Sequence, residues 1–398
     1  MINKTKTEPM ENKKYLIVAL IGLLVVMPAF AGEPESAAAN QETGYIFERQ
    51  IELPVLPAKN QARTGTCWSF ATVSFIESEL IRMGKGEHDL SEMFFVRYVY
   101  PEKADRYVRF HGNINFWQGS LSHDVMKVAE EYGFVPDVVY RGLEYGTDIH
   151  NHGELAAVLV AFIDGVLSRR GGVLTPVWME AYNSILDVYL GEVPEQFTYN
   201  GQTYTPKSFM TEMDFEPSEY VEITSFSHKP FYEKFVLEVP DNWAHELYYN
   251  LPLNEMMDVI NYALANGYTI AWDGDVSERA FSHSNGLALV PEKTWEERSE
   301  EERRELFRSP QPEKSVTQES RQASFDNFST TDDHLMHITG TARDQNGTLY
   351  YLTKNSYGET NDYDGFLYMS EPYVKKKTIA VMVHKDAIPP AIRTKLGL

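Results

Sequence analysis

Cysteine is almost absent from this chain: Cys67 is the only one among 398 residues. A single thiol cannot form a disulfide within the chain, so the fold must be stabilised by its core. The composition is sufficient for that, because 43% of the residues are hydrophobic and 13% are aromatic, which argues against disorder. The lone cysteine is therefore either a buried packing residue or a group that carries chemistry.

Positive charge is also scarce. The chain holds 36 Lys and Arg against 58 Asp and Glu, a formal net charge of −22. Such an acidic protein will not hold nucleic acid through its phosphates, so the sequence excludes a nucleic-acid partner. Metal-ligand patterns are missing from the sequence as well, because His150 and His152 flank an asparagine in a polar loop without a further ligand at suitable spacing. We expect no metal and no organic cofactor.

Long hydrophobic runs are limited to one near the N-terminus. Lys13 and Lys14 precede the apolar run Tyr15–Met27, and Ala29–Ala31 offers a small-x-small cleavage site. The run is too short to span a membrane comfortably. We expect a cleavable signal peptide over residues 1–31, export to a bacterial periplasm or exterior, and no stable membrane insertion after processing. An uncleaved signal anchor is the alternative.

Cys67 has the surroundings that a reacting thiol needs. Gln61 lies six residues upstream, where its amide can point at the same reacting carbonyl as the sulfur, and Gly65 permits a tight backbone approach. The chain is strongly apolar from Cys67 through Leu80, which predicts a helix that begins at the cysteine. The free N–H groups and the dipole of a helix N-terminus favour a thiolate over a thiol. We therefore interpret Cys67 as a nucleophile.

A cysteine nucleophile needs a histidine to hold its proton and a third group to orient that histidine. Both occur late in the chain. The runs 333–340 and 349–358 read as strands joined by the turn Asp344–Gly347, whose Asn-Gly pair is a strong hairpin signal. On paired antiparallel strands His334 and Asn355 can lie side by side. A neutral amide suits the role of orienter, because it adds no negative charge near the sulfur.

His337 competes with His334 for the role of catalytic histidine. Side chains alternate along a strand, so residues 334 and 337 point to opposite faces and cannot both face the cysteine. His334 follows an acidic residue and precedes Gly340 by six residues. We interpret His334 as the catalytic histidine and His337 as a structural one.

These blocks resemble a known family. The stretch Gln61–Trp68 resembles the active-site block of papain-like (C1) cysteine peptidases. The run Asp333–Gly340 resembles the histidine strand of that family, and Asn355–Gly358 resembles its Asn-Ser-Trp-Gly block, with Tyr357 in place of the Trp. The three blocks stand in the family's order.

Within that family the bleomycin hydrolase and aminopeptidase C branch is the closer match. The grounds are the run Glu77–Gly86, the run Leu90–Phe95 and a large insertion between the two halves. The likeness covers most of residues 48–385. It implies an α+β, papain-like fold of two lobes, one mostly helical and one an antiparallel β-sheet. The expected divisions are a flexible leader over 32–47, a helical lobe over 48–165, the insertion over 166–250, the β-sheet lobe over 251–383 and a C-terminal tail over 384–398.

Local patterns add expected elements. Helices are predicted over residues 91–100, 122–132 and 253–266, a strand over 268–272, a hairpin turn at Asn200-Gly201, and a solvated surface helix with a loop over 295–322. Asp273 and Asp275 follow the strand, and their spacing resembles that of a functional pair of acidic residues. We interpret them as residues of a strand-end turn.

The resemblance also implies roles. Cys67 attacks the scissile carbonyl, Gln61 helps to hold the oxyanion, and Asn355 orients His334, which is protonated in the resting enzyme. The expected substrate contacts are Trp68, Gly119, Ser120 and Leu398.

Removal of residues from peptide N-termini is the implied reaction. In this branch the C-terminus of the chain lies in the cleft, where its carboxylate binds the free α-amine of the substrate, commonly within a hexamer. Here the tail from His384 to Leu398 has only 15 residues, which reach about 50 Å when extended. The alternatives are an endopeptidase with an open cleft, an inactive peptide-binding homologue and an acyltransferase that uses the same Cys–His pair.

Overall fold

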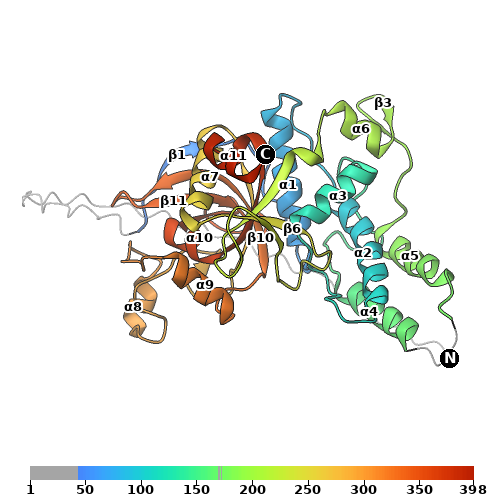
Figure 1. Ribbon diagram of the computed structural model, residues 1–398. Coiled ribbons are helices and arrows are strands. Elements are labelled where there is room, and N and C mark those ends of the chain that lie inside the picture. The colour runs from blue at the N-terminus through green and yellow to red at the C-terminus, as the bar shows by residue number, and fades with distance from the viewer. Residues whose placement is uncertain (1–43, 169–170, 172) are drawn as a thin grey trace, which may run out of the picture. The chain divides into compact units, whose positions relative to one another are not determined.

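The computed structural model describes residues 44–398 except 169, 170 and 172 (Figure 1). The expected signal peptide and nearly all of the expected leader lie outside the described residues. Over the part that is described, no helix is both long enough and apolar enough to cross a membrane.

A group of helices follows the cysteine along the chain. These are α1 (Cys67–Arg82), α2 (Glu92–Arg109), α3 (Ser122–Tyr132), α4 (Gly153–Leu167), α5 (Val177–Leu190) and α6 (Pro206–Glu212). The apolar run that begins at Cys67 forms α1, and every α1 side chain through Leu80 is buried. Figure 1 shows α1 between the strands on one side and α2 to α5 on the other. Helix α1 packs against α2, α3 and the strand that carries His334.

The rest of the fold is built on a mostly antiparallel sheet of 11 strands in the order β5-β6-β4-β13-β7-β10-β11-β12-β9-β8, with β1 paired to β10. The strands are β1 (Glu48–Glu52), β4 (Tyr220–Thr224), β5 (Lys234–Val236), β6 (Leu247–Asn250), β7 (Ile270–Gly274), β8 (Phe281–Ser282), β9 (Leu287–Ala288), β10 (His334–Arg343), β11 (Leu349–Lys354), β12 (Phe366–Ser370) and β13 (Thr378–His384). The expected hairpin is confirmed, because β10 and β11 pair antiparallel on either side of the Asn-Gly turn. A second hairpin, β2 (Phe197–Tyr199) and β3 (Gln202–Tyr204), turns at Asn200-Gly201 as expected.

The two faces of the sheet pack on different helices. Leu335 of β10 belongs to the hydrophobic cluster that contains α1 to α5. Its neighbour Met336 belongs to the cluster that contains α7 (Leu253–Ala265), α10 (Glu371–Lys377) and α11 (Pro390–Leu396). Alternation along β10 thus separates the helix that begins at the cysteine from the helix at the C-terminus.

Several expected boundaries are corrected. Residues 220–250, which we expected within the insertion, supply three strands to the main sheet because β4 pairs with β13. Helix α2 continues to Arg109 through Pro101, where the sequence indicated an end. At the end of the expected flexible leader, Phe47 stacks on Tyr368 with ring centroids 3.8 Å apart.

The charged run 295–322 is also less solvated than expected. It forms α8 (Glu300–Glu305) and the start of α9 (Gln318–Asp326). Arg321 of α9 is buried, because its guanidinium donates to the carbonyl oxygens of Ser225 and Lys375 and lies over the ring of Phe226.

Candidate active site

Cys67 is the first residue of α1. Gln118 fixes the loop before it: Gly65 N donates to Gln118 Oε1 over 2.8 Å, and Trp68 Nε1 donates to the Gln118 carbonyl over 3.0 Å. The thiol is nearly enclosed, with Cys67 only 9% exposed. We did not predict this role for Gln118, because a single glutamine 51 residues downstream of the cysteine belongs to no catalytic motif.

His334 and Asn355 lie side by side at the end of the β10–β11 pair. His334 Nε2 is 2.8 Å from Asn355 Oδ1. An amide oxygen only accepts, so Nε2 carries the proton and Nδ1 is the basic nitrogen. Tyr357 packs on the imidazole with ring centroids 5.1 Å apart, which is the place where the resembled family has a Trp. Asn355 Oδ1 also accepts from the backbone N–H of Ser356 over 2.7 Å, and its Nδ2 contacts His283 Nδ1 at 3.2 Å.

The start of β10 meets the start of α1. The backbone N–H of Leu335, the residue after His334, is close enough to the Cys67 sulfur to lower the pKa of the thiol. His337, in contrast, bonds through Nδ1 to Ser74 Oγ at 2.9 Å, deeper along α1. The structure thus brings His334 to Cys67 and leaves His337 in the core between α1 and the sheet.

The thiol and the imidazole both favour their neutral forms. Burial raises the pKa of Cys67 to about 12, although the N–H groups of Leu335 and Trp68 oppose the rise. Burial likewise lowers the pKa of His334 to about 4, against the effect of Asn355. Burial thus opposes the thiolate and the imidazolium that we expected, because it disfavours both charged forms. The resting ion pair stays a prediction.

Gln61 is held next to Asn355. Its Nε2 donates to the Thr64 carbonyl over 2.7 Å, and the hydroxyl of Ser356 donates to its Oε1. The backbone N–H of Gln61 donates to the Ser356 carbonyl over 2.9 Å. Ser356 therefore positions the amide from the β11 side, a role that we did not assign although the residue lies within the Asn-Ser-Tyr-Gly block.

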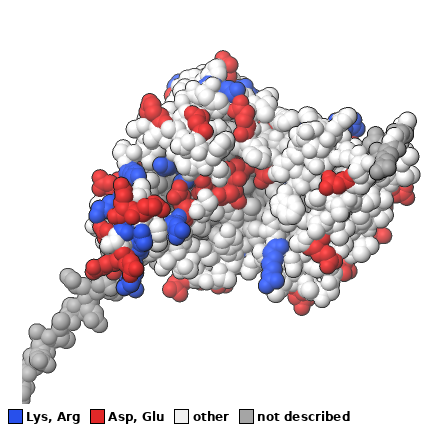
Figure 2. Space-filling view, turned by 90° about the horizontal axis from the view of Figure 1, so that it is seen from below, with Lys and Arg blue, Asp and Glu red and all other residues white. Residues whose placement is uncertain are grey.

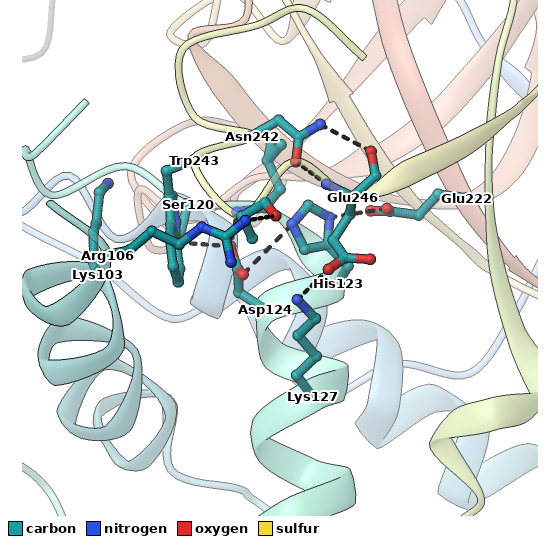
Figure 3. Close-up of polar contacts among 12 residues, drawn as sticks. Lys103, Arg106, Ser120, His123, Asp124, Lys127, Glu222, Asn242, Trp243 and Glu246 are labelled. Carbon is teal, nitrogen blue, oxygen red and sulfur yellow. Dashed lines mark hydrogen bonds and ion pairs between the residues drawn. The ribbon is translucent and has the colours of Figure 1, made fainter. Parts of the chain in front are cut away.

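Two of the expected substrate contacts are enclosed. Trp68 is fully buried and packs in the core. Ser120 is 1% exposed; its hydroxyl donates to Asp124 Oδ2 and accepts from Trp243 Nε1, each over 2.8 Å (Figure 3). Neither side chain can touch a peptide in this arrangement. Gly119 is partly exposed beside them.

Leu398 is placed away from the thiol. The tail folds as α11, and Leu398 packs on the hydrophobic cluster of α7 and α11, on the face of the sheet opposite α1. The tail folds this way because Ile392 and Leu396 are apolar and become buried. The structure thus corrects our expectation that the C-terminus lies beside Cys67.

A polar network joins the helices to the sheet below Ser120 (Figure 3). His123 of α3 bonds through Nδ1 to Glu222 of β4 at 2.9 Å and to the Tyr248 hydroxyl of β6 at 3.1 Å. Burial alone would lower the pKa of His123, but the carboxylates of Asp124 and Glu222 outweigh it and raise the pKa to about 9. His123 is therefore a buried cation at neutral pH.

Comparisons with known proteins agree with this architecture. The fold is that of papain-like cysteine peptidases, an α+β arrangement in which a cysteine at a helix N-terminus faces a histidine on a sheet. Residues 177–397 match the model of the Peptidase C1-like family. This is more than half of the chain, and the chain belongs to that family.

The relatives point to one branch. The chain is 21% identical to "Aminopeptidase C" of Lactococcus lactis subsp. lactis (strain IL1403), over 86% of this chain and 83% of the relative. It is 22% identical to "Aminopeptidase C" of Lactobacillus helveticus, over 85% and 82%. The crystal structure of PepW from Lactobacillus rhamnosis HN001 superposes with a TM-score of 0.66 at 18% identity, over 88% of this chain and 84% of that one. The chain is thus a cysteine peptidase of the Peptidase C1-like family with a papain-like fold, and peptides are its substrates.

Proposed function

We propose that this protein is a cysteine aminopeptidase that removes residues from peptide N-termini with Cys67, His334, Asn355 and Gln61. The observation that carries the chemistry is the 2.8 Å contact of His334 Nε2 with Asn355 Oδ1. It leaves Nδ1 as the basic nitrogen, and the strand of His334 packs on α1, whose first residue is Cys67. Support for the aminopeptidase specificity comes from the names of the two relatives.

In the proposed reaction, His334 Nδ1 accepts the thiol proton while the Cys67 sulfur bonds to the carbonyl carbon. The Gln61 amide and the Cys67 backbone N–H donate to the oxyanion, each lowering the barrier by about 3 kcal/mol. The C–N bond then breaks, and the leaving amine takes the proton from His334. Water, deprotonated by His334, cleaves the thioester and restores the thiol.

A papain-like endopeptidase is the second candidate function. One observation favours it: the C-terminal carboxylate, which would bind the substrate amine in the resembled branch, lies with α11 on the other face of the sheet. An endopeptidase would need no such anchor.

The experiment that separates the two compares an aminoacyl fluorogenic amide with its N-acetylated twin, in reductant. We expect the wild-type protein to cleave only the free-amine substrate, and Cys67→Ala and His334→Ala to cleave neither. Asn355→Ala should retain partial activity, because Asn355 orients the ring and transfers no proton. Equal cleavage of the twins by wild type would refute the aminopeptidase proposal.

Export and assembly are further proposals. The basic, apolar and small-residue pattern of residues 1–31 supports a signal peptide. N-terminal sequencing of the mature protein should begin at Gly32, and a start at Met1 would refute cleavage. The branch resemblance supports a homohexamer, which light scattering would show as six times the mass of the mature chain.

A further inference from the structure

A cavity of about 440 Å³ is lined by the segments that follow β7 and β9, the chain before α8 and the end of α10. This volume lies within the range of small-molecule sites in proteins. Five basic and two acidic residues line it, which leaves a local charge of +3 in a chain whose net charge is −22. These residues are Arg279, Arg298, Lys314, Lys376, Lys377, Glu278 and Glu296. We refer to this pocket as the basic cavity.

Arg298 brings a buried charge to the basic cavity without an acidic partner. The residue is only 6% exposed. Its Nε donates to the Lys293 carbonyl over 3.2 Å, and its Nη1 donates to the Glu302 carbonyl over 3.3 Å. Among the described residues, no carboxylate pairs with this guanidinium and nothing accepts from its Nη2. A buried charge that lacks a counter-charge is unfavourable, and an anion in the cavity would supply one.

Three further cations line the basic cavity with their hydrogen-bond donors free. Arg279 lies over the Trp295 ring, with its guanidinium carbon 5.5 Å from the ring centroid. Over the described part of the chain, the side chains of Arg279, Lys314 and Lys376 form neither an ion pair nor a hydrogen bond. These donors are therefore available to a ligand.

Positive charge is in excess around Lys376. Burial lowers the pKa of the Lys376 ammonium, and the charges of Lys377 and Lys314 lower it further, while Glu278 opposes them. Glu278 is itself paired with Lys377. Cations that disfavour one another in this way would be stabilised by an anion placed between them.

Acidic side chains are mixed with the basic ones at this end of the molecule. Figure 2 shows both kinds gathered at the left, which is the side of α8 in Figure 1. Glu296 lines the cavity and forms no ion pair within the described ranges. The carboxylate of Glu297 accepts from the Thr294 backbone N–H over 2.8 Å. Hydrogen bonds from Thr294 lower the pKa of Glu297 most, and the charge of Lys314 lowers it less.

A second cavity shows what distinguishes the basic one. It has a similar volume, about 460 Å³, and is also lined by basic residues, among them Arg109 and Lys127. There Arg109 pairs with Asp105, and Lys127 pairs with Glu246. Volume and basic residues alone therefore do not indicate a ligand. The distinguishing property of the basic cavity is that four of its cations lack a carboxylate partner.

We propose that the basic cavity binds a small oxyanion that carries two or more negative charges. The two guanidinium groups donate to its phosphate or carboxylate oxygens, and the ammonium groups of Lys314 and Lys376 act as point charges. The volume admits more than one anionic group, so a multivalent anion is favoured over a monovalent one. This site is separate from the proposed peptidase reaction and does not depend on it.

Calorimetric titration of the purified protein with tripolyphosphate and with citrate would test the proposal. At 0.1 M salt, charges more than about 10 Å away are largely screened, so the acidic remainder of the chain does little to repel the ions. We expect saturable binding of one ion per chain. The tighter of the two ions shows whether the natural ligand bears phosphate or carboxylate groups. Absence of saturable binding for both ions would overturn the proposal.

A matched pair of double variants tests the location of the site. Lys314→Gln combined with Lys376→Gln should weaken binding at least tenfold. The control combines Lys127→Gln with Lys395→Gln, which changes the net charge equally at two lysines that pair with glutamates elsewhere. The control should bind as tightly as wild type. Equal weakening by the two double variants would mean non-specific attraction and would overturn the proposal.

A gain of affinity keeps the test independent of folding. Glu296→Gln removes an unpaired carboxylate from the lining, so binding should become at least twofold tighter, which a misfolded protein would not show. In thermal melts, tripolyphosphate should raise the Tm of wild type and of Glu296→Gln but not that of the Lys314→Gln, Lys376→Gln variant. A Tm increase of the same size in that double variant would place the ion elsewhere and refute the assignment.

Discussion

At the scale of single residues, Ser356 matters because it fixes the orientation of the Gln61 side-chain amide. Its hydroxyl donates to Gln61 Oε1, so the amide nitrogen of Gln61 is turned toward the cysteine loop, where Thr64 accepts one of its hydrogens. The second hydrogen of Nε2 is the one that the proposed oxyanion would receive. Ser356 contacts no substrate in this scheme and is a positioning residue.

Substitution of this pair should separate donation from positioning. Gln61→Ala removes a donor and should lower kcat by about 10²–10³-fold. Ser356→Ala keeps the donor and loosens it, so kcat should fall roughly tenfold with little change in KM. Steady-state kinetics on the free-amine substrate would measure both. A Ser356→Ala loss as large as that of Gln61→Ala would contradict the division of roles.

The reactivity of the thiol should depend steeply on pH. Burial raises the pKa of Cys67 to about 12, and below the pKa the thiolate fraction grows roughly tenfold for each pH unit. The rate of iodoacetamide alkylation of the free enzyme should therefore rise throughout the range from pH 6 to pH 9. A rate that is already high and constant near pH 6 would indicate a resting thiolate instead.

At the scale of elements, α3 and β4 are joined by the buried ion pair of His123 and Glu222. The pKa of His123 is raised from 6.5 to about 9 in the folded protein. The raised pKa stabilises the folded protein: its contribution to the free energy of unfolding is complete below pH 6.5 and is lost as the pH rises through about 9. Its size is about 3 kcal/mol of unfolding free energy.

Urea unfolding of wild type and His123→Gln would measure this contribution. The difference in unfolding free energy should be largest at pH 6 and should shrink by about 3 kcal/mol by pH 10. A difference that does not change with pH would mean that His123 is neutral in the folded protein.

Elements also show what a sequence can and cannot predict. Helix α1 and the β10–β11 hairpin follow from local signals, the apolar run from Cys67 and the Asn-Gly turn, and both are observed. The division into two lobes was predicted from the resemblance to papain-like peptidases and not from local patterns. The order of strands that places residues 220–250 in the main sheet could not be predicted, because it depends on pairing with β13 far along the chain.

The carboxyl groups near the thiol could not be predicted from local sequence patterns either, because their positions also depend on contacts between distant segments. We expected Asp273 in a turn at the end of its strand, but it lies within β7 and pairs with Leu335. Neither Asp241 nor Asp332 belongs to a motif. Only the packing of three distant segments brings them to Cys67.

At the scale of the whole molecule, the tail serves stability in this structure. Leu396 is buried in the cluster of α7, and Lys395 pairs with Glu255 at 2.7 Å. Deletion of residues 395–398 should lower the unfolding free energy by about 2 kcal/mol, the usual effect of losing a buried leucine. The preference for free-amine substrates should remain.

Thermal melts and the twin substrates would test both parts of that expectation. The point substitution Leu396→Ala is the matched control, because it removes the same packing and keeps the C-terminal carboxylate. If the truncated protein folds and cleaves the N-acetylated and the free-amine substrates at equal rates, the C-terminus is the group that binds the substrate amine.

The single thiol of Cys67 has a practical consequence. Because the chain has no other thiol, a colorimetric sulfhydryl assay on the native protein counts intact nucleophiles without background. The inactive, oxidised fraction of any preparation then follows by difference, and rates can be normalised to the concentration of intact thiol. The Cys67→Ala protein, in turn, is a thiol-free framework in which a new cysteine at any chosen position accepts a spectroscopic label at that position alone.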